Sequence, residues 1–195
     1  MTDSIINIRD TLRKEALQRR NDLAEHLHFA FSHLIRNKVL ELTGELDVPV
    51  VHCYLSFRTE VETLSLVRAM ESSGLQVIAP VVVQEGDVLK MEHYQLSKIL
   101  TSGLYGLPEP ERNIRSDINS IQMVIVPIVA YDGTGTRLGY GKGFYDRFLA
   151  EINPSVKRIG LAFSVQEADV IPRLAYDQQL DMIVTETGIV HTERN

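Results

Sequence analysis

The sequence predicts an α/β protein with three layers, in which a mainly parallel sheet is flanked by helices. Short apolar runs rich in β-branched residues alternate with stretches of helical period, as expected for strands that are covered on both faces. The 195 residues are 44% hydrophobic and 24% charged, which is typical of a globular chain with one sizeable core. We therefore expect a single domain over residues 1–195.

The N-terminal part of the chain is rich in helix formers. Apolar residues recur there at spacings of three and four, which predicts two helices, or one broken helix, over about residues 4–43, packed on the α/β core. Ser4 is expected to cap the first helix, and Gly44 to end the second. Asp22, with Glu25 three residues later, resembles a capping box between them.

The segment after Pro49 predicts a βαβ unit followed by a local antiparallel hairpin. Its elements are a buried strand, a helix, a second strand and the return strand of the hairpin, expected at residues 50–55, 60–73, 77–83 and 88–94. Residues 97–120 contain two glycines and two prolines and show no sustained period. We expect a long excursion over the surface there, and loops of that length are often functional.

The remainder of the chain completes the alternation. A buried strand, a helix and two further strands are expected at residues 123–127, 144–151, 158–162 and 181–185. Because strands and helices alternate, the sheet they form should be mainly parallel.

Charge and cysteine content restrict the partners of the chain. The 20 basic and 26 acidic residues give a net charge of −6, which disfavours non-specific binding of nucleic acid. The single cysteine, Cys53, cannot form an internal disulfide, and we expect a reducing, cytoplasmic compartment. No signal peptide or long apolar run is recognisable, so no membrane partner is expected, and a monomer is the default.

Five of the twelve glycines fall within residues 133–143, between a predicted buried strand and a predicted helix. Glycines there allow backbone N–H groups to turn toward an anion at a helix N-terminus. Arg137 and Lys142 add positive charge, and Asp146 lies where a carboxylate can reach a metal that bridges phosphates. The spacing is not that of a Walker A motif. The residues alone leave phosphate binding and a plain tight turn both open.

The run from Val126 to Asp146 closely resembles the signature of the 5-formyltetrahydrofolate cyclo-ligase family. Stretches at residues 9–14, 54–63 and 107–110 resemble the same family in the same order. The resemblance implies an ATP- and Mg²⁺-dependent enzyme that converts 5-formyltetrahydrofolate to 5,10-methenyltetrahydrofolate and releases ADP and phosphate. It also implies that the γ-phosphoryl group is transferred to the formyl oxygen, so the protein positions the substrates and neutralises charge.

The same resemblance implies roles for individual residues. The ATP phosphates would meet Arg9, Arg13, Arg137, Gly139, Gly141, Lys142 and Gly143. Among these, Lys142 and Arg137 would be the catalytic cations, and the family often has lysine in place of Arg9. The Mg²⁺ ligands would be Asp146 and Asp181. The substrate contacts would be Leu55, Glu60, Tyr140 and Tyr145, with Phe144 packed beside the pterin or adenine ring.

Structural interpretations of these residues stay open. Arg9 and Arg13 are four apart and could form a solvated helix face. Asp146 could favour the helix dipole, Asp181 could belong to a turn, and Glu60 could be a helix-start carboxylate.

Two alternative functions also stay open. One is a related enzyme that acts on another heterocycle in cofactor salvage, and the other is a folate or nucleotide sensor without turnover.

Arg20, which follows the N-terminal motif, is interpreted as a charged residue on the surface.

Overall fold

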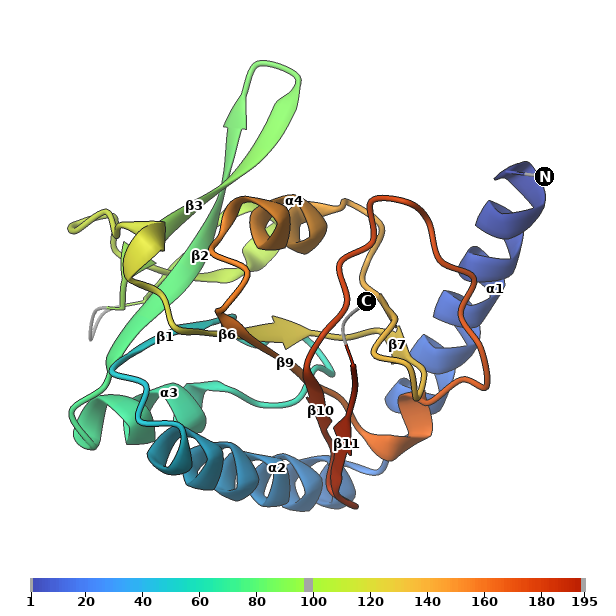
Figure 1. Cartoon of the computed structure of the whole chain (residues 1–195), viewed down its shortest axis with the longest axis horizontal. Coiled ribbons are helices and arrows are strands. Elements are labelled where there is room, and N and C mark those ends of the chain that lie inside the picture. The colour runs from blue at the N-terminus through green and yellow to red at the C-terminus, as the bar shows by residue number, and fades with distance from the viewer. Residues whose placement is uncertain (1, 97–99, 194–195) are drawn as a thin grey trace.

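The computed structural model describes residues 2–96 and 100–193. A seven-stranded sheet with the order β11-β10-β9-β6-β1-β2-β3 forms its centre. Helices α2 (Glu25–Glu45) and α3 (Leu64–Ser72) cover one face, and α4 (Phe144–Glu151) covers the other (Figure 1). The predicted three-layer α/β fold is confirmed.

The inner strands of this sheet are parallel. They are β1 (Val50–Cys53), β2 (Gln76–Glu85), β6 (Met123–Pro127), β9 (Lys157–Leu161) and β10 (Met182–Val184). Both edges are antiparallel: β3 (Val88–Gln95) returns along β2 as the predicted hairpin, and β11 (Ile189–His191) returns along β10. The sequence did not indicate β11, because its two apolar residues, Ile189 and Val190, stand between polar neighbours.

The two N-terminal helices have boundaries that differ from the prediction. Helix α1 covers Thr2–Asn21, so Ser4 lies within the helix and does not cap it. Helix α2 starts after Ala24, which has no side chain able to cap, so the Asp22–Glu25 capping box is wrong. Gly44 does not end α2, which continues to Glu45, and the glycine costs only about 1 kcal/mol inside a helix.

The helix expected at residues 60–73 starts only at Leu64. Residues 57–60 instead form a turn, in which the Glu60 N–H donates to the carbonyl oxygen of Phe57 at 3.2 Å. Arg58 has a positive φ of 55° in this turn. Glu60 is therefore carried by a loop rather than by a helix.

The excursion over residues 100–120 is more ordered than a surface loop. It contains strands β4 (Leu100–Ser102) and β5 (Pro108–Pro110) and short 3-10 turns η1 (Leu104–Gly106) and η2 (Ile118–Ser120). Residues 97–99 of the predicted excursion lie outside the described residues. Glu109 on β5 is buried and accepts a hydrogen bond from the Val82 N–H at 3.3 Å, so this segment packs on the part of β2 that extends beyond its pairing with β1.

The remaining elements lie between β6 and β10. A two-stranded hairpin of β7 (Ala130–Tyr131) and β8 (Arg137–Leu138) leads into α4, and a 3-10 turn η3 (Ser164–Gln166) follows β9. Helix α4 has the predicted boundaries.

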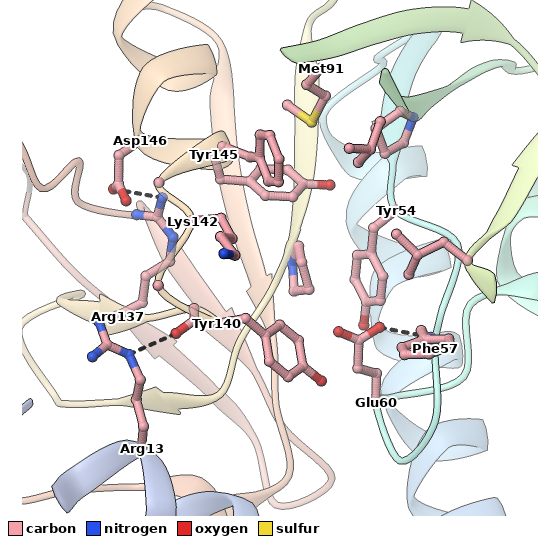
Figure 2. Close-up of a pocket in the computed structure, with 18 of the residues that line it drawn as sticks. Arg13, Tyr54, Phe57, Glu60, Met91, Arg137, Tyr140, Lys142, Tyr145 and Asp146 are labelled. Carbon is pink, nitrogen blue, oxygen red and sulfur yellow. Dashed lines mark hydrogen bonds and ion pairs between the residues drawn. The ribbon is translucent and has the colours of Figure 1, made fainter. Parts of the chain in front are cut away.

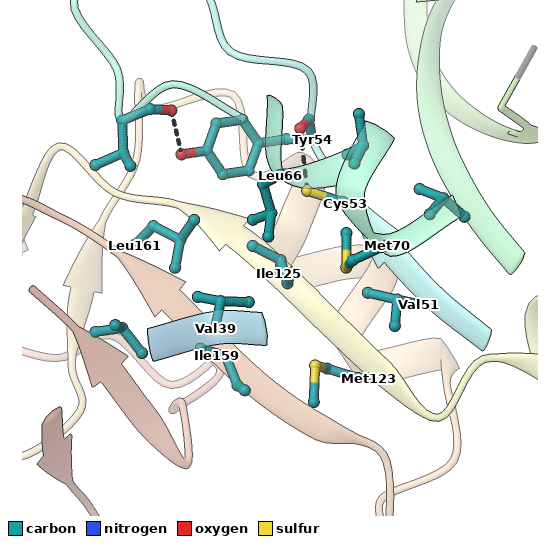
Figure 3. Packing of buried hydrophobic residues seen from close by; sticks show 14 of the residues in the cluster. Val39, Val51, Cys53, Tyr54, Leu66, Met70, Met123, Ile125, Ile159 and Leu161 are labelled. Carbon is teal, nitrogen blue, oxygen red and sulfur yellow. Dashed lines mark hydrogen bonds between the residues drawn. The ribbon is translucent and has the colours of Figure 1, made fainter. Parts of the chain in front are cut away.

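The core beneath α2 and α3 contains the cysteine. Cys53 is fully buried together with Val51, Leu66 and Ile125 (Figure 3). Burial raises the pKa of this thiol far above its usual value, and the thiol is therefore unreactive.

Within the described residues, no helix is long and apolar enough to cross a membrane.

Candidate active site

A cavity of about 920 Å³ opens at the carboxyl ends of β1 and β6. Tyr54 and Leu55, which follow β1, and Pro127, which ends β6, line its floor. Ligands of open α/β sheets bind at this edge, where the loops after the parallel strands meet. Figure 2 shows that side chains from the glycine-rich loop and from the 57–60 turn face one another across the cavity.

One wall is the glycine-rich loop, defined here as residues 139–143, which connects β8 to α4. Gly141 and Gly143 have φ values of +91° and +66°, a conformation that glycine adopts without strain. Gly143 is the N-cap residue of α4, so the loop presents its backbone where the helix dipole favours an anion. Lys142 is exposed within this loop and lines the cavity.

Behind the loop lies an ion pair between Arg137 and Asp146. Nη2 of Arg137 donates to Oδ1 of Asp146 at 2.9 Å, and the Arg137 side chain is only 4% exposed. The backbone of Gln178 binds both partners: its N–H donates to Asp146 at 3.1 Å, and its carbonyl oxygen accepts from Arg137. Burial lowers the pKa of Arg137, and the nearby carboxylate of Asp146 counteracts that shift. The pair is therefore part of the framework that holds the loop.

Helix α1 contributes two arginines to the cavity. Nε of Arg13 donates to the carbonyl oxygen of Gly139 at 2.9 Å, which attaches the helix to the glycine-rich loop (Figure 2). Arg9 is buried and forms a bidentate ion pair with Asp177, at 2.5 and 2.9 Å, and a bond to the carbonyl oxygen of Pro172. In this structure Asp177 neutralises Arg9, so a phosphate would compete with that carboxylate.

The opposite wall contains a buried carboxylate. Oε2 of Glu60 accepts a hydrogen bond from the Phe57 N–H at 2.8 Å. Burial raises the pKa of Glu60, while the Phe57 N–H, Arg20 and Tyr140 each oppose the increase. The arrangement therefore places a carboxylate in a dry part of the cavity, where it can accept hydrogen bonds from a ligand's N–H groups.

The remaining surface of the cavity is largely apolar. Pro80 and Val82 on β2 and Met91 on β3 line this part. The hydroxyl group of Tyr145 is buried and has no hydrogen-bond partner within the described residues. A flat, partly polar ring system fits such a surface.

Nearly all of the site residues predicted from the sequence line the cavity. Those that line it are Arg9, Arg13, Leu55, Glu60, Arg137, Gly139, Tyr140, Gly141, Lys142, Gly143, Phe144, Tyr145 and Asp146.

Asp181 is the exception. It precedes β10 and accepts a hydrogen bond from the Arg158 N–H at 2.8 Å, at the amino ends of β9 and β10. The cavity opens at the carboxyl ends of β1 and β6, and Asp181 is not among the residues that line it, whereas Asp146 is.

Several cavity residues were not proposed from the sequence. Among them are Tyr54, Phe57, Arg58, Glu109, Leu174, Tyr176 and Asp177. Glu109 belongs to one of the stretches that resemble the family, but nothing in its neighbours indicated that its side chain would be buried. Asp177 is four residues before Asp181, and the sequence alone does not distinguish which of the two reaches the cavity.

The fold and the cavity define an α/β protein in which a glycine-rich loop at a helix N-terminus faces an apolar wall with a buried carboxylate. The model of the 5-formyltetrahydrofolate cyclo-ligase family matches residues 5–186. The chain belongs to this family of enzymes.

Known relatives agree with this assignment. A 5-formyltetrahydrofolate cyclo-ligase from Haemophilus influenzae is 27% identical over 90% of this chain and 97% of its own length. A protein of the same name from Saccharomyces cerevisiae is 29% identical over 92% and 96%. The solution structure of the Aquifex aeolicus 5,10-methenyltetrahydrofolate synthetase has a TM-score of 0.82 and 28% identity, and it covers 96% of this chain and 94% of that one.

Proposed function

We propose that the protein converts 5-formyltetrahydrofolate to 5,10-methenyltetrahydrofolate with consumption of ATP. The observation that carries this proposal is the two-sided cavity: Arg13, Lys142 and the glycine-rich loop lie on one wall, and Glu60 lies on the other. Phosphates suit the first wall, and the N–H groups of a pterin suit the second.

The chemistry requires activation of a poor leaving group. The formyl oxygen attacks the γ-phosphorus of ATP, and ADP leaves. N10 of the folate then attacks the formyl carbon, the oxygen departs with the phosphate, and N10 loses its proton. Both nucleophiles belong to the substrates, so the protein supplies position and charge. On this proposal Lys142 and Arg13 bind the phosphates, and Glu60 orients the pterin.

A magnesium ion fits the carboxylates that line the cavity. Within the described residues no group of three or more histidine, cysteine, aspartate or glutamate side chains forms a ready metal site. Mg²⁺ in nucleotide sites is commonly held by one or two carboxylates together with the phosphates. On this proposal Asp146, whose side chain lines the cavity, would hold it, and it would neutralise charge on the phosphates.

Magnesium dependence tests this assignment. We expect methenyl product, followed by its near-ultraviolet absorbance, to form with ATP and Mg²⁺ and to stop when a chelator is added. Asp146→Asn should require a higher magnesium concentration, because a neutral amide binds the cation less tightly than a carboxylate does. A magnesium titration of Asp146→Asn that coincides with wild type would remove Asp146 from the metal site.

The same assay distinguishes the alternative functions. ADP should appear only when 5-formyltetrahydrofolate is present. ATP hydrolysis that depends on a different heterocycle would indicate a related salvage enzyme, and binding without ADP formation would indicate a sensor.

We further propose that the protein has only small-molecule partners. We also propose that it is a monomer and acts in a reducing, cytoplasmic compartment.

Glu60→Gln tests the substrate wall. The change replaces one acceptor oxygen with a donor, so we expect folate binding to weaken by about 1–3 kcal/mol, the cost of leaving a buried polar group unpaired. The affinity for ATP should change little. Calorimetric titration of each ligand measures both effects. Weakened ATP binding with intact folate binding would instead place Glu60 on the nucleotide side.

A further inference from the structure

Arg20 is a buried cation that does not line the cavity. Its exposed fraction is 2%, and it is among the largest fully buried side chains of the described residues. This position contradicts the expectation of surface charge. A buried guanidinium is costly unless its donors are satisfied, so its partners indicate why it is there.

The three nitrogen atoms of Arg20 each bind a different segment that builds the cavity. Nη2 donates to the hydroxyl group of Tyr140 at 2.8 Å, in the glycine-rich loop. Nε donates to the hydroxyl group of Thr59 at 3.2 Å, in the 57–60 turn. Nη1 donates to the carbonyl oxygen of Ile128, just after β6, at 3.2 Å. One planar group therefore joins the Tyr140 side chain and the 57–60 turn to the end of β6.

The 57–60 turn is held from the same side by neighbouring residues. The Thr59 hydroxyl group donates to Asn21 at 2.7 Å, at the end of α1. Nε2 of His28, on α2, lies 2.9 Å from the carbonyl oxygen of Glu60. The backbone of the turn is therefore tied to the corner between α1 and α2, where Arg20 lies.

Arg20 also acts on the charge of Glu60. The Arg20 guanidinium lowers the pKa of Glu60 and so favours its ionised form. The Tyr140 hydroxyl group has the same effect, and Arg20 donates a hydrogen bond to that hydroxyl group. The phenols of Tyr54 and Tyr145 also interact with this carboxylate, and the His28 ring contacts its backbone. Arg58, in the same turn, lines the cavity and lies over the Phe57 ring. Arg20 is the cation that lowers the pKa of Glu60.

We propose that Arg20 is a positioning residue for the folate half of the active site: from behind the cavity wall it joins Tyr140 to the 57–60 turn and orients the carboxylate of Glu60. The inference rests on the proposed binding of folate by Glu60. A lysine at this position would keep the positive charge but would lack the planar guanidinium group that binds three partners at once.

Two substitutions separate the geometric and electrostatic contributions. Arg20→Lys should raise the Kd for 5-formyltetrahydrofolate about tenfold, because a single ammonium group cannot replace the three bonds. Arg20→Met should raise it further. We expect the pKa of Glu60 to rise in Arg20→Met, because the nearby positive charge is lost. The carboxylate must be ionised to accept two N–H groups. The pH below which folate binding is lost should therefore be higher in this variant than in wild type. The Kd for ATP should stay within about twofold in both variants.

Arg19→Met is the matched control. Arg19 is the neighbouring arginine of α1, and it binds the carbonyl oxygens of Val165 and Glu167 away from the cavity. It should leave the folate Kd and its pH profile unchanged. If wild type itself does not bind 5-formyltetrahydrofolate, the proposed function fails, independently of Arg20.

Thr59→Val keeps the inference testable if the Arg20 variants do not fold. Thr59 does not line the cavity. The change removes its contacts with Nε of Arg20 and with Asn21 while preserving the shape of the side chain, and Asn21→Ala, which removes only the second contact, is its control. We expect Thr59→Val to raise the folate Kd about threefold without affecting ATP. An unchanged folate Kd in Thr59→Val, or equal losses of folate and ATP affinity in folded Arg20 variants, would overturn the proposal.

Discussion

Replacement of Lys142 by alanine is expected to reduce kcat by about 10²–10³-fold, which corresponds to about 2.7–4 kcal/mol of transition-state stabilisation. The ammonium group is exposed in the glycine-rich loop and lines the cavity. Charge on the transferred phosphoryl group and on the leaving ADP is largest in the transition state, so a fixed cation there contributes to kcat more than to binding. Steady-state kinetics with both substrates saturating measures the change.

The fold should not depend on Lys142. In the described part of the chain the bond that involves Lys142 uses its backbone carbonyl oxygen and not its side chain, so the thermal midpoint should stay at the wild-type value. Lys14→Ala is a suitable control, because Lys14 is an exposed lysine of α1 beside Arg13 but outside the cavity. Wild-type kcat in Lys142→Ala would remove the residue from the catalytic site.

Arg137→Met is expected to show its largest effect on stability. The change leaves Asp146 and the carbonyl oxygen of Gln178 without their cationic partner. Removing one member of a buried ion pair costs about 3–5 kcal/mol, and we expect the lower end, about 3 kcal/mol, because the Asp146 side chain is 25% exposed. Urea denaturation without ligands measures the loss as a lower midpoint at constant slope.

A double variant provides the control for Arg137. Arg137→Met combined with Asp146→Leu removes both charges, so it should recover part of the stability that Arg137→Met alone loses. A midpoint equal to wild type in the single variant would show that the ion pair contributes nothing to the fold.

The fold was predictable wherever a segment's own pattern determines its structure. Helix α4 has the expected boundaries because a glycine precedes an amphipathic stretch. The start of α3 was predicted too early, because contacts from His28 and Arg20 hold the 57–60 turn. Such tertiary contacts leave no local period in the sequence.

The site was predictable to the extent that a motif identifies residue types. The motif could not show that Arg9 is paired with Asp177, since the two are 168 positions apart. It also could not place Asp181, because only the direction of β10 shows which end of the strand faces the cavity. The position of Arg20 could have been predicted. It lies four residues after the fully buried Ala16 and so on the same helix face, which packs on the core. The helical pattern was traced through apolar residues alone, so an arginine on that face was not noticed.

Helix α1 determines the order in which the active site can be completed. It is synthesised before the segments it contacts, because its arginines bind Gly139, Val165, Glu167, Pro172 and Asp177, which lie 126 to 168 positions later. Contacts so distant in sequence form late in folding, because the entropy of closing the intervening chain must be overcome first. A partly synthesised chain therefore has no complete phosphate wall, and ATP or folate would bind and stabilise only the finished molecule.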